Sequence, residues 1–127
     1  MNNIHATVFA LDYDNTAHRD IDGWVMFTKL MRSRGHSVFL VTMRYPEEVC
    51  GEPGANPKFV PMAPELLDAV CGVYTTGRKA KRPHMEAHGI KVTVWIDDEP
   101  RTITEDAESI WPGNVTPRGH VIALIHE

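Results

Sequence analysis

The sequence has no long apolar run, little cysteine and no excess of positive charge. Its apolar stretches all fall short of the roughly 20 residues that a helix needs to cross a bilayer. Its first five residues show neither the basic cluster nor the apolar segment of a signal peptide. We therefore expect a cytoplasmic protein with no membrane partner. The formal net charge of -4 argues against broad, nonspecific nucleic-acid binding, although it leaves room for a small basic patch.

Cysteine and histidine give no clear site. The two cysteines, Cys50 and Cys71, form no C-x-x-C pair, which favours a reducing compartment. We assign no zinc site to the seven histidines, which are scattered along the chain. The rest of the composition is that of an ordinary globular protein, with 43% hydrophobic and 24% charged residues. A chain of 127 residues suits one domain, so we expect residues 1–127 to form a single unit.

Short apolar runs alternate with helix-like segments along the chain, which predicts an α/β fold with a mostly parallel sheet. The runs that read as strands cover residues 7–11, 38–42, 72–76, 92–96 and 121–125. Apolar residues at helical spacing predict a helix from about residue 22 to residue 34, capped by Asp20 or Asp22 and ended by Gly35. The proline-rich stretch 51–64 predicts a surface loop, followed by a short helix to about residue 70.

Two carboxylates follow the first predicted strand directly. Asp12 and Asp14 come at the end of an apolar run, and Asn15 and Thr16 come next. Ligands of open α/β sheets bind outside the carboxyl ends of the strands, so this pair is expected at the rim of the sheet. Close carboxylates repel each other unless a cation or a shared proton relieves them, and Mg²⁺ prefers oxygen ligands. The alternative is an Asx-turn in which Asp14 or Asn15 caps the next turn of the chain.

Further polar residues follow two other predicted strands. Thr42 ends the second strand, and the pair Asp97-Asp98 follows the fourth. Arg44 lies just beyond Thr42, where its guanidinium is suited either to a substrate phosphate or to an ion pair with Glu47 or Glu48. The carboxyl ends of parallel strands meet at one edge of a sheet, so we expect these groups to converge.

A basic segment precedes the predicted helix over residues 83–88, which Pro83 starts at its first position and Gly89 ends. Its cations are Arg78, Lys79, Lys81 and Arg82. Such a run is usually a solvated surface, but a strand end followed by a helix N-terminus favours phosphate binding. We take Lys81 as the functional lysine of this segment, with Lys79 as the alternative.

The chain therefore carries D-x-D-N-T, a strand-end Thr, a Lys and a strand-end D-D, in that order between Val8 and Asp98. This pattern resembles the haloacid dehalogenase superfamily of phosphohydrolases. The resemblance implies a Rossmann-like sheet with the first strand between the second and the fourth. Many members carry a cap domain, for which the spacing here leaves no room. Asn15 departs from the glycine of many members, and asparagine tolerates the left-handed conformation that such a turn requires.

The resemblance also implies a mechanism. Asp12 attacks phosphorus and becomes an aspartyl-phosphate, and Asp14 protonates the leaving group and then deprotonates water. Thr42 and Lys81 stabilise the phosphoryl group. Mg²⁺ is implied as the cofactor, with ligands from Asp12, the backbone carbonyl of Asp14, Asp97 and Asp98. Of the last two, we expect Asp97 to bind the ion directly and Asp98 to bind it or orient its waters. Substrate contacts are expected from Thr16, Arg44, Arg78 and Lys79.

The substrate is inferred from the absence of a cap. An open site suits a phosphate on a large molecule, or one held partly by a second subunit of a homo-oligomer. The cations near the strand ends favour a nucleotide or a phosphorylated polynucleotide end. Two alternatives stay open: a phospho-accepting receiver-like domain, in which the acidic pair comes early and the acceptor Asp stands alone, and a catalytically silent binding module with the same fold.

Overall fold

A computed structural model describes residues 5–113, so the predicted strand 121–125 lies outside the described residues. The described residues form an α/β fold with one sheet of four parallel strands in the order β3-β2-β1-β4. The strands are β1 (Val8–Leu11), β2 (Ser37–Thr42), β3 (Gly72–Thr75) and β4 (Val94–Ile96). The Rossmann-like sheet and the position of β1 between β2 and β4 are confirmed.

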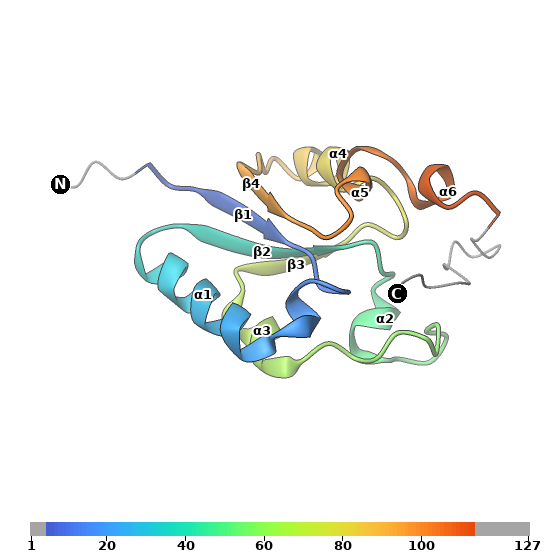
Figure 1. Ribbon diagram of the computed structural model, residues 1–127, viewed down its shortest axis with the longest axis horizontal. Coiled ribbons are helices and arrows are strands. Elements are labelled where there is room, and N and C mark those ends of the chain that lie inside the picture. The colour runs from blue at the N-terminus through green and yellow to red at the C-terminus, as the bar shows by residue number, and fades with distance from the viewer. Residues whose placement is uncertain (1–4, 114–127) are drawn as a thin grey trace.

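Helices cover both faces of the sheet, which explains why β1 and β2 read as continuous apolar runs (Figure 1). Leu11 and Leu40 point to the face packed by α1 (Ile21–Ser33) and α3 (Pro64–Ala69). Ala10 and Val41 point to the opposite face, where they contact Met85 of α4 (Lys81–Ala87). Because successive side chains of a strand alternate between faces, each run contributes to two apolar clusters.

The ends of α1 are those that the sequence predicts. Oδ1 of Asp20 accepts a hydrogen bond of 3.1 Å from the backbone N–H of Gly23 and so caps the first turn. Gly35 follows the C-cap residue with a φ of 91°, a left-handed conformation that glycine adopts without steric cost. Residues 51–63 contain no regular element, as the density of proline predicted.

Two predicted element starts differ from the observed ones by two residues. Helix α4 begins at Lys81, two residues before Pro83, so Pro83 is its third residue. Proline is tolerated there because the first N–H groups of a helix have no intrahelical partner. Strand β4 begins at Val94 and not at Val92. The hydroxyl of Thr93 accepts from the backbone N–H of Val8 at 2.8 Å, in place of a backbone carbonyl.

The remaining described elements are short. They are the 3-10 turn η1 (Ala17–Arg19), α2 (Glu47–Cys50), α5 (Arg101–Thr104) and α6 (Ala107–Ile110). Neither η1 nor α2 has a clear signal in the sequence. Asn15 has a φ of 61°, so the left-handed turn after the first acidic pair is confirmed. Among residues 5–113, none of the helices has the length and apolar character that spanning a bilayer requires.

Candidate active site

The carboxyl ends of β1, β2 and β4 and the start of α4 surround one pocket of about 170 Å³. Most of the residues that the sequence predicts for the site line this pocket. They are Asp12, Asp14, Thr42, Arg44, Arg78, Lys81, Asp97 and Asp98. The strand-end rule therefore brings together groups that lie far apart in the sequence.

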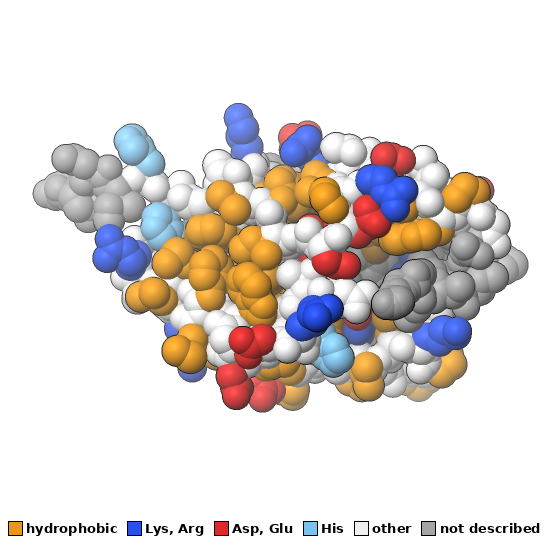
Figure 2. All heavy atoms as spheres, in the orientation of Figure 1, with side chains coloured by type: hydrophobic (Ala, Val, Ile, Leu, Met, Phe, Trp, Pro, Cys, Tyr) orange, Lys and Arg blue, Asp and Glu red, His pale blue; other side chains and the backbone are white. Residues whose placement is uncertain are grey.

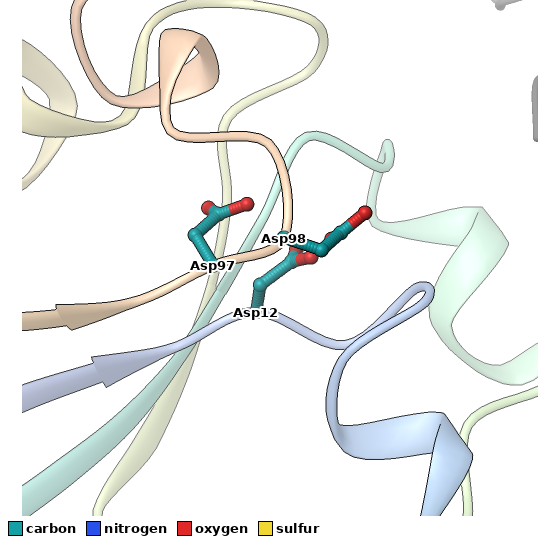
Figure 3. Close-up of side chains that lie close together, drawn as sticks. All are labelled: Asp12, Asp97 and Asp98. Atoms are coloured by element: carbon teal, nitrogen blue, oxygen red, sulfur yellow. The ribbon is translucent and has the colours of Figure 1, made fainter.

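Three carboxylates form an acidic cluster just beyond the ends of β1 and β4 (Figure 3). Asp12 follows β1, while Asp97 and Asp98 follow β4, the neighbouring strand. One oxygen from each of the three lies within 4.8 Å of the others. Three hard oxygen donors at this spacing suit a magnesium ion, which binds through carboxylates and keeps several waters. The carboxylate of Asp14 is not part of this cluster.

Lys81 bridges the two acidic pairs. Its Nζ atom donates to Oδ1 of Asp12 at 2.9 Å and to Oδ2 of Asp97 at 2.6 Å. Lys81 is the first residue of α4, lines the pocket and has a side chain that is only 2% exposed. Burial on its own lowers the pKa of Lys81, but the carboxylates of Asp12 and Asp97 outweigh burial and raise that pKa above the usual lysine value.

Asp12 is a strongly perturbed carboxyl group. Burial raises its pKa to about 8; the Lys81 ammonium opposes this rise, and the Asp97 carboxylate adds to it. A carboxyl group that is so buried and so close to other carboxylates accepts a cation readily, because the cation relieves both effects. Perturbed groups of this kind in a pocket are typical of functional sites.

Thr16 links the two acidic pairs on the side away from Lys81. Its hydroxyl lies 3.1 Å from Oδ2 of Asp12 and 2.9 Å from Oδ1 of Asp98. The same oxygen accepts from the backbone N–H of Asp98 at 3.2 Å. In this arrangement Thr16 holds the acidic cluster together, and its role as a substrate contact stays a prediction.

Asp14 is paired with Arg44. The guanidinium binds both carboxylate oxygens, at 3.0 Å from Nε and 2.7 Å from Nη2. Arg44 is 2% exposed, whereas the Asp14 side chain is 37% exposed. Of the two carboxylates expected as ion-pair partners of Arg44, Glu48 contacts it through its backbone carbonyl, and the Glu48 carboxylate binds Arg78. The sequence analysis did not anticipate the Asp14–Arg44 pair.

The other cations of the basic segment face different surroundings. Arg78 is 5% exposed, pairs with the buried carboxylate of Glu48 at 3.0 Å, and adopts a φ of 73°. Lys79 is 72% exposed and lies 3.8 Å from Asp106, outside the pocket that Lys81 lines. Of the two candidate lysines, Lys81 is therefore the one that contacts the acidic cluster.

Thr42 and Thr102 complete the polar lining of the pocket. Thr42 is 1% exposed, and its hydroxyl accepts from the backbone N–H of Arg44 at 3.2 Å. Thr102, in α5, donates to Oδ2 of Asp97 at 3.1 Å. The sequence did not indicate Thr102, because this residue lies in a helix after the strand-end motif and belongs to no recognisable motif itself.

Two aromatic side chains of the pocket were also missed. Phe59 comes from the proline-rich loop and lies over the Arg44 guanidinium, 4.8 Å from ring centroid to Cζ. Trp111 follows α6. Neither is at the end of a strand, and Phe59 lies in a loop without a periodic pattern, so the sequence gives no clear signal for either.

One histidine spacing was overlooked. His84 and His88 form an H-x-x-x-H pair on α4 and its C-cap, with ring centroids 4.8 Å apart. Partial burial lowers the pKa of His84, and the neighbouring His88 adds to this effect. Within residues 5–113, no third metal-ligating side chain joins the pair.

Comparison with known proteins gives no relative: no family model, no curated protein sequence and no solved structure matches this chain significantly.

Proposed function

We propose that the protein is a magnesium-dependent phosphohydrolase of the haloacid dehalogenase type. The observation that carries this proposal is the Lys81 ammonium, which lies 2.9 Å from Asp12 and 2.6 Å from Asp97 at the edge of a parallel sheet. A carboxylate nucleophile attacks a phosphate dianion only where positive charge offsets their repulsion. A fixed ammonium beside Asp12, next to a cluster of metal-ligating oxygens, supplies the setting for this reaction.

The donor set fits Mg²⁺. Asp12, Asp97 and Asp98 would hold the ion through one carboxylate oxygen each. When bound, the ion supplies positive charge that draws the substrate phosphate toward Asp12 and lowers the repulsion between them. Thr16 would help to keep Asp98 in place, because its hydroxyl donates to the Asp98 carboxylate and accepts from the Asp98 backbone N–H, while the same oxygen lies 3.1 Å from Oδ2 of Asp12.

The reaction is a double displacement at phosphorus. An Asp12 oxygen forms a bond to phosphorus, the bond to the leaving oxygen breaks, and Asp14 gives that oxygen a proton. Asp14, now a carboxylate, takes a proton from water, whose oxygen attacks phosphorus and releases Asp12 and inorganic phosphate. Lys81 and the Thr42 hydroxyl stabilise the transferring phosphoryl group.

The open pocket supports the substrate proposal. Among residues 5–113, every strand belongs to the one sheet, and the helices lie around it. This arrangement favours a phosphohydrolase without a cap domain over the pocket. Such a site favours a phosphate on a large molecule, here a nucleotide or a phosphorylated polynucleotide end. The face in Figure 2 intersperses acidic and basic side chains, so any basic contact surface on this face is small. Binding to a polynucleotide would then depend only weakly on salt, with each phosphate contact contributing about −0.7 to −0.9 to the slope.

The test is a phosphatase screen with Mg²⁺ over nucleotides, a 3′-phosphorylated oligonucleotide, sugar phosphates and a phosphopeptide. We expect turnover that an excess of chelator abolishes and that added Mg²⁺ restores. A stable phosphoaspartate without turnover would instead favour a receiver-like domain. A protein that binds Mg²⁺ but hydrolyses none of these substrates would be a silent binding module. If the sugar phosphate or the phosphopeptide leads by tenfold in kcat/KM, the nucleic-acid substrate class is wrong.

A further inference from the structure

Arg44 is a tightly held polar side chain in the pocket. Its guanidinium binds both oxygens of Asp14 and the backbone carbonyl oxygens of Glu48 and Val60, at distances of 2.6 to 3.0 Å. The rings of Tyr13 and Phe59 lie over it, with centroids 5.2 and 4.8 Å from Cζ. With the side chain 2% exposed, this guanidinium has one fixed position.

These contacts leave only one N–H donor of Arg44 for a substrate. Arginine has five N–H donors, and four of them serve the bonds to Asp14, Glu48 and Val60. A two-point contact with a substrate phosphate would require the guanidinium to leave Asp14. The geometry therefore argues against the expected role of Arg44 as a phosphate ligand.

The Asp14 carboxylate, by contrast, has Arg44 as its one side-chain partner among residues 5–113. Its side chain is 37% exposed, and the contacts described for its carboxylate are the two from Arg44. A half-exposed aspartate normally samples several rotamers, whereas a two-point contact with a planar guanidinium fixes the plane of the carboxylate as well as its position.

We infer that Arg44 is a positioning residue that aims the carboxyl group of Asp14 at the leaving oxygen and at the attacking water. This inference rests on the proposed function. Arg44 touches neither phosphorus nor the leaving group and acts only through Asp14. The two-point contact with the guanidinium holds the carboxyl group of Asp14 in one orientation.

The same contacts assign a role to the segment after β2. Helix α2 and the proline-rich loop carry no acid, base or nucleophile of the proposed reaction, yet the carbonyls of Glu48 and Val60 and the ring of Phe59 hold Arg44. In this chain, therefore, a loop beside the pocket determines where the acid–base group lies.

The experiment compares Arg44→Lys and Arg44→Met with the wild type on aryl phosphates whose leaving groups differ in basicity, and on an alkyl phosphate. Leaving groups that depart as stable anions need no acid, whereas an alkoxide does. We expect Arg44→Met to lower kcat at least tenfold more on the alkyl phosphate than on 4-nitrophenyl phosphate, with KM changed less than threefold on both. Arg44→Lys restores part of the loss, because one ammonium still reaches Asp14.

Arg78→Lys is the matched control. Arg78 is also buried, also stacks on Phe59 and also lines the pocket, but its carboxylate partner is Glu48. Its substitution should lower activity on all substrates by a similar factor. A second control places Arg44→Lys in an Asp14→Asn background, where it should add no further dependence on the leaving group, since two residues that act through one group are not additive.

Two results would overturn the inference. A loss in Arg44 variants that is equal for all leaving groups assigns Arg44 a purely structural role. A rise in KM of tenfold or more on every substrate, with kcat retained, makes it a phosphate ligand. If thermal melting shows that Arg44→Met is unfolded, Arg44→Lys alone decides by its leaving-group dependence. A folded wild type that hydrolyses no phosphate at all overturns the proposed function itself, whereas a flat leaving-group series in active variants overturns only the role of Arg44.

Discussion

The ammonium group of Lys81 lies 2.6 Å from Oδ2 of Asp97, and the two side chains are only 2% and 3% exposed. A buried ion pair of this kind costs several kcal/mol in desolvation, which its Coulomb attraction repays only with good geometry and further hydrogen bonds. Here the same ammonium also binds Asp12, and Thr102 also donates to Asp97. The arrangement keeps a positive charge beside the proposed nucleophile without the help of solvent.

Lys81→Ala should therefore reduce kcat/KM on the order of 10²–10³-fold, the usual loss when one preorganised electrostatic contact is removed. Lys79→Ala should leave kcat/KM within about threefold of the wild type, because the Lys79 side chain is 72% exposed and its carboxylate partner is Asp106, outside the pocket. Steady-state kinetics of the two variants checks this. If Lys79→Ala shows the larger loss, the assignment of the lysine is wrong. Thermal melting of Lys81→Ala separates lost chemistry from lost folding.

Asp12→Asn should abolish turnover of every phosphate substrate, because an amide oxygen does not form the acyl-phosphate intermediate. Asp14→Asn should retain activity on substrates whose leaving groups need no proton, provided that loss of the phosphoryl group from Asp12 is not limiting. The measurement is kcat for both variants over the aryl phosphate series. Rescue of Asp12→Asn by a good leaving group, without rescue of Asp14→Asn, would mean that nucleophile and acid are exchanged.

Magnesium binding should strengthen as pH rises. Burial raises the pKa of Asp12 to about 8, and the ion binds the ionised form, so Mg²⁺ competes with a proton below that pH. The apparent affinity for Mg²⁺ should rise about tenfold from pH 6 to pH 7 and level off above pH 8, with proton release on binding. Calorimetry with Mg²⁺ alone in buffers of different ionisation enthalpy measures both. Asp106→Asn is the control, since Asp106 lies outside the acidic cluster. An affinity that does not change over this range contradicts the assignment of Asp12 as a ligand.

The same raised pKa affects folding in the absence of metal. The pKa of Asp12 in the folded chain, about 8, lies above the ordinary aspartate value of 3.8, so the folded state binds the proton more tightly than the unfolded state does. This contribution to stability is complete below pH 4 and is lost as pH rises through 8. In metal-free protein, Asp12→Asn should remove this part of the pH dependence, as urea unfolding at pH 5 and at pH 8.5 would show.

Gly77→Ala should destabilise the fold more than Gly89→Ala. Both glycines have a positive φ, 61° and 76°, which costs a non-glycine residue about 1–2 kcal/mol. A Cβ atom at position 77 would lie 2.9 Å from Cε1 of Tyr45, whereas position 89 has nothing within 4 Å. The free energy of unfolding in urea is measured for both variants. Both carry the backbone cost of a positive φ, so the difference between them gives the cost of the contact with Tyr45. Equal losses would mean that Tyr45 moves aside freely.

The strands and the residues that follow them are the part of this fold that the sequence predicts well. Strands β1 and β2 are buried on both faces, so they form continuous apolar runs that are bounded by polar residues. Because parallel strands end at the same edge, the positions of Asp12, Thr42 and Asp97 in the chain were sufficient to bring them together. The helix α4 was placed two residues late, because proline was read as its first residue and is in fact its third.

The sequence does not predict which side chains contact one another around the pocket. The sequence favours Glu47 or Glu48 as the ion-pair partner of Arg44, but the path of the backbone brings the guanidinium to the carboxylate of Asp14 and to the backbone carbonyl of Glu48. Phe59 reaches the pocket from a loop without periodic pattern, so no local rule signals its position. Such contacts depend on tertiary geometry, which secondary-structure propensities and the spacing of residues in the sequence do not predict.

The long sequence separation between the residues in contact around the acidic cluster has a consequence for synthesis. Asp12 and Lys81 are 69 positions apart, and Thr16 and Asp98 are 82 positions apart. A chain growing from its N-terminus therefore exposes Asp12 well before the lysine and the carboxylates that surround it exist. Since β4 pairs only with β1 among the described strands, the last strand of the described sheet is also the last to be made. The nascent protein thus has no complete acidic cluster until nearly all of the described residues have been synthesised, and premature termination before Asp97 yields a product without one.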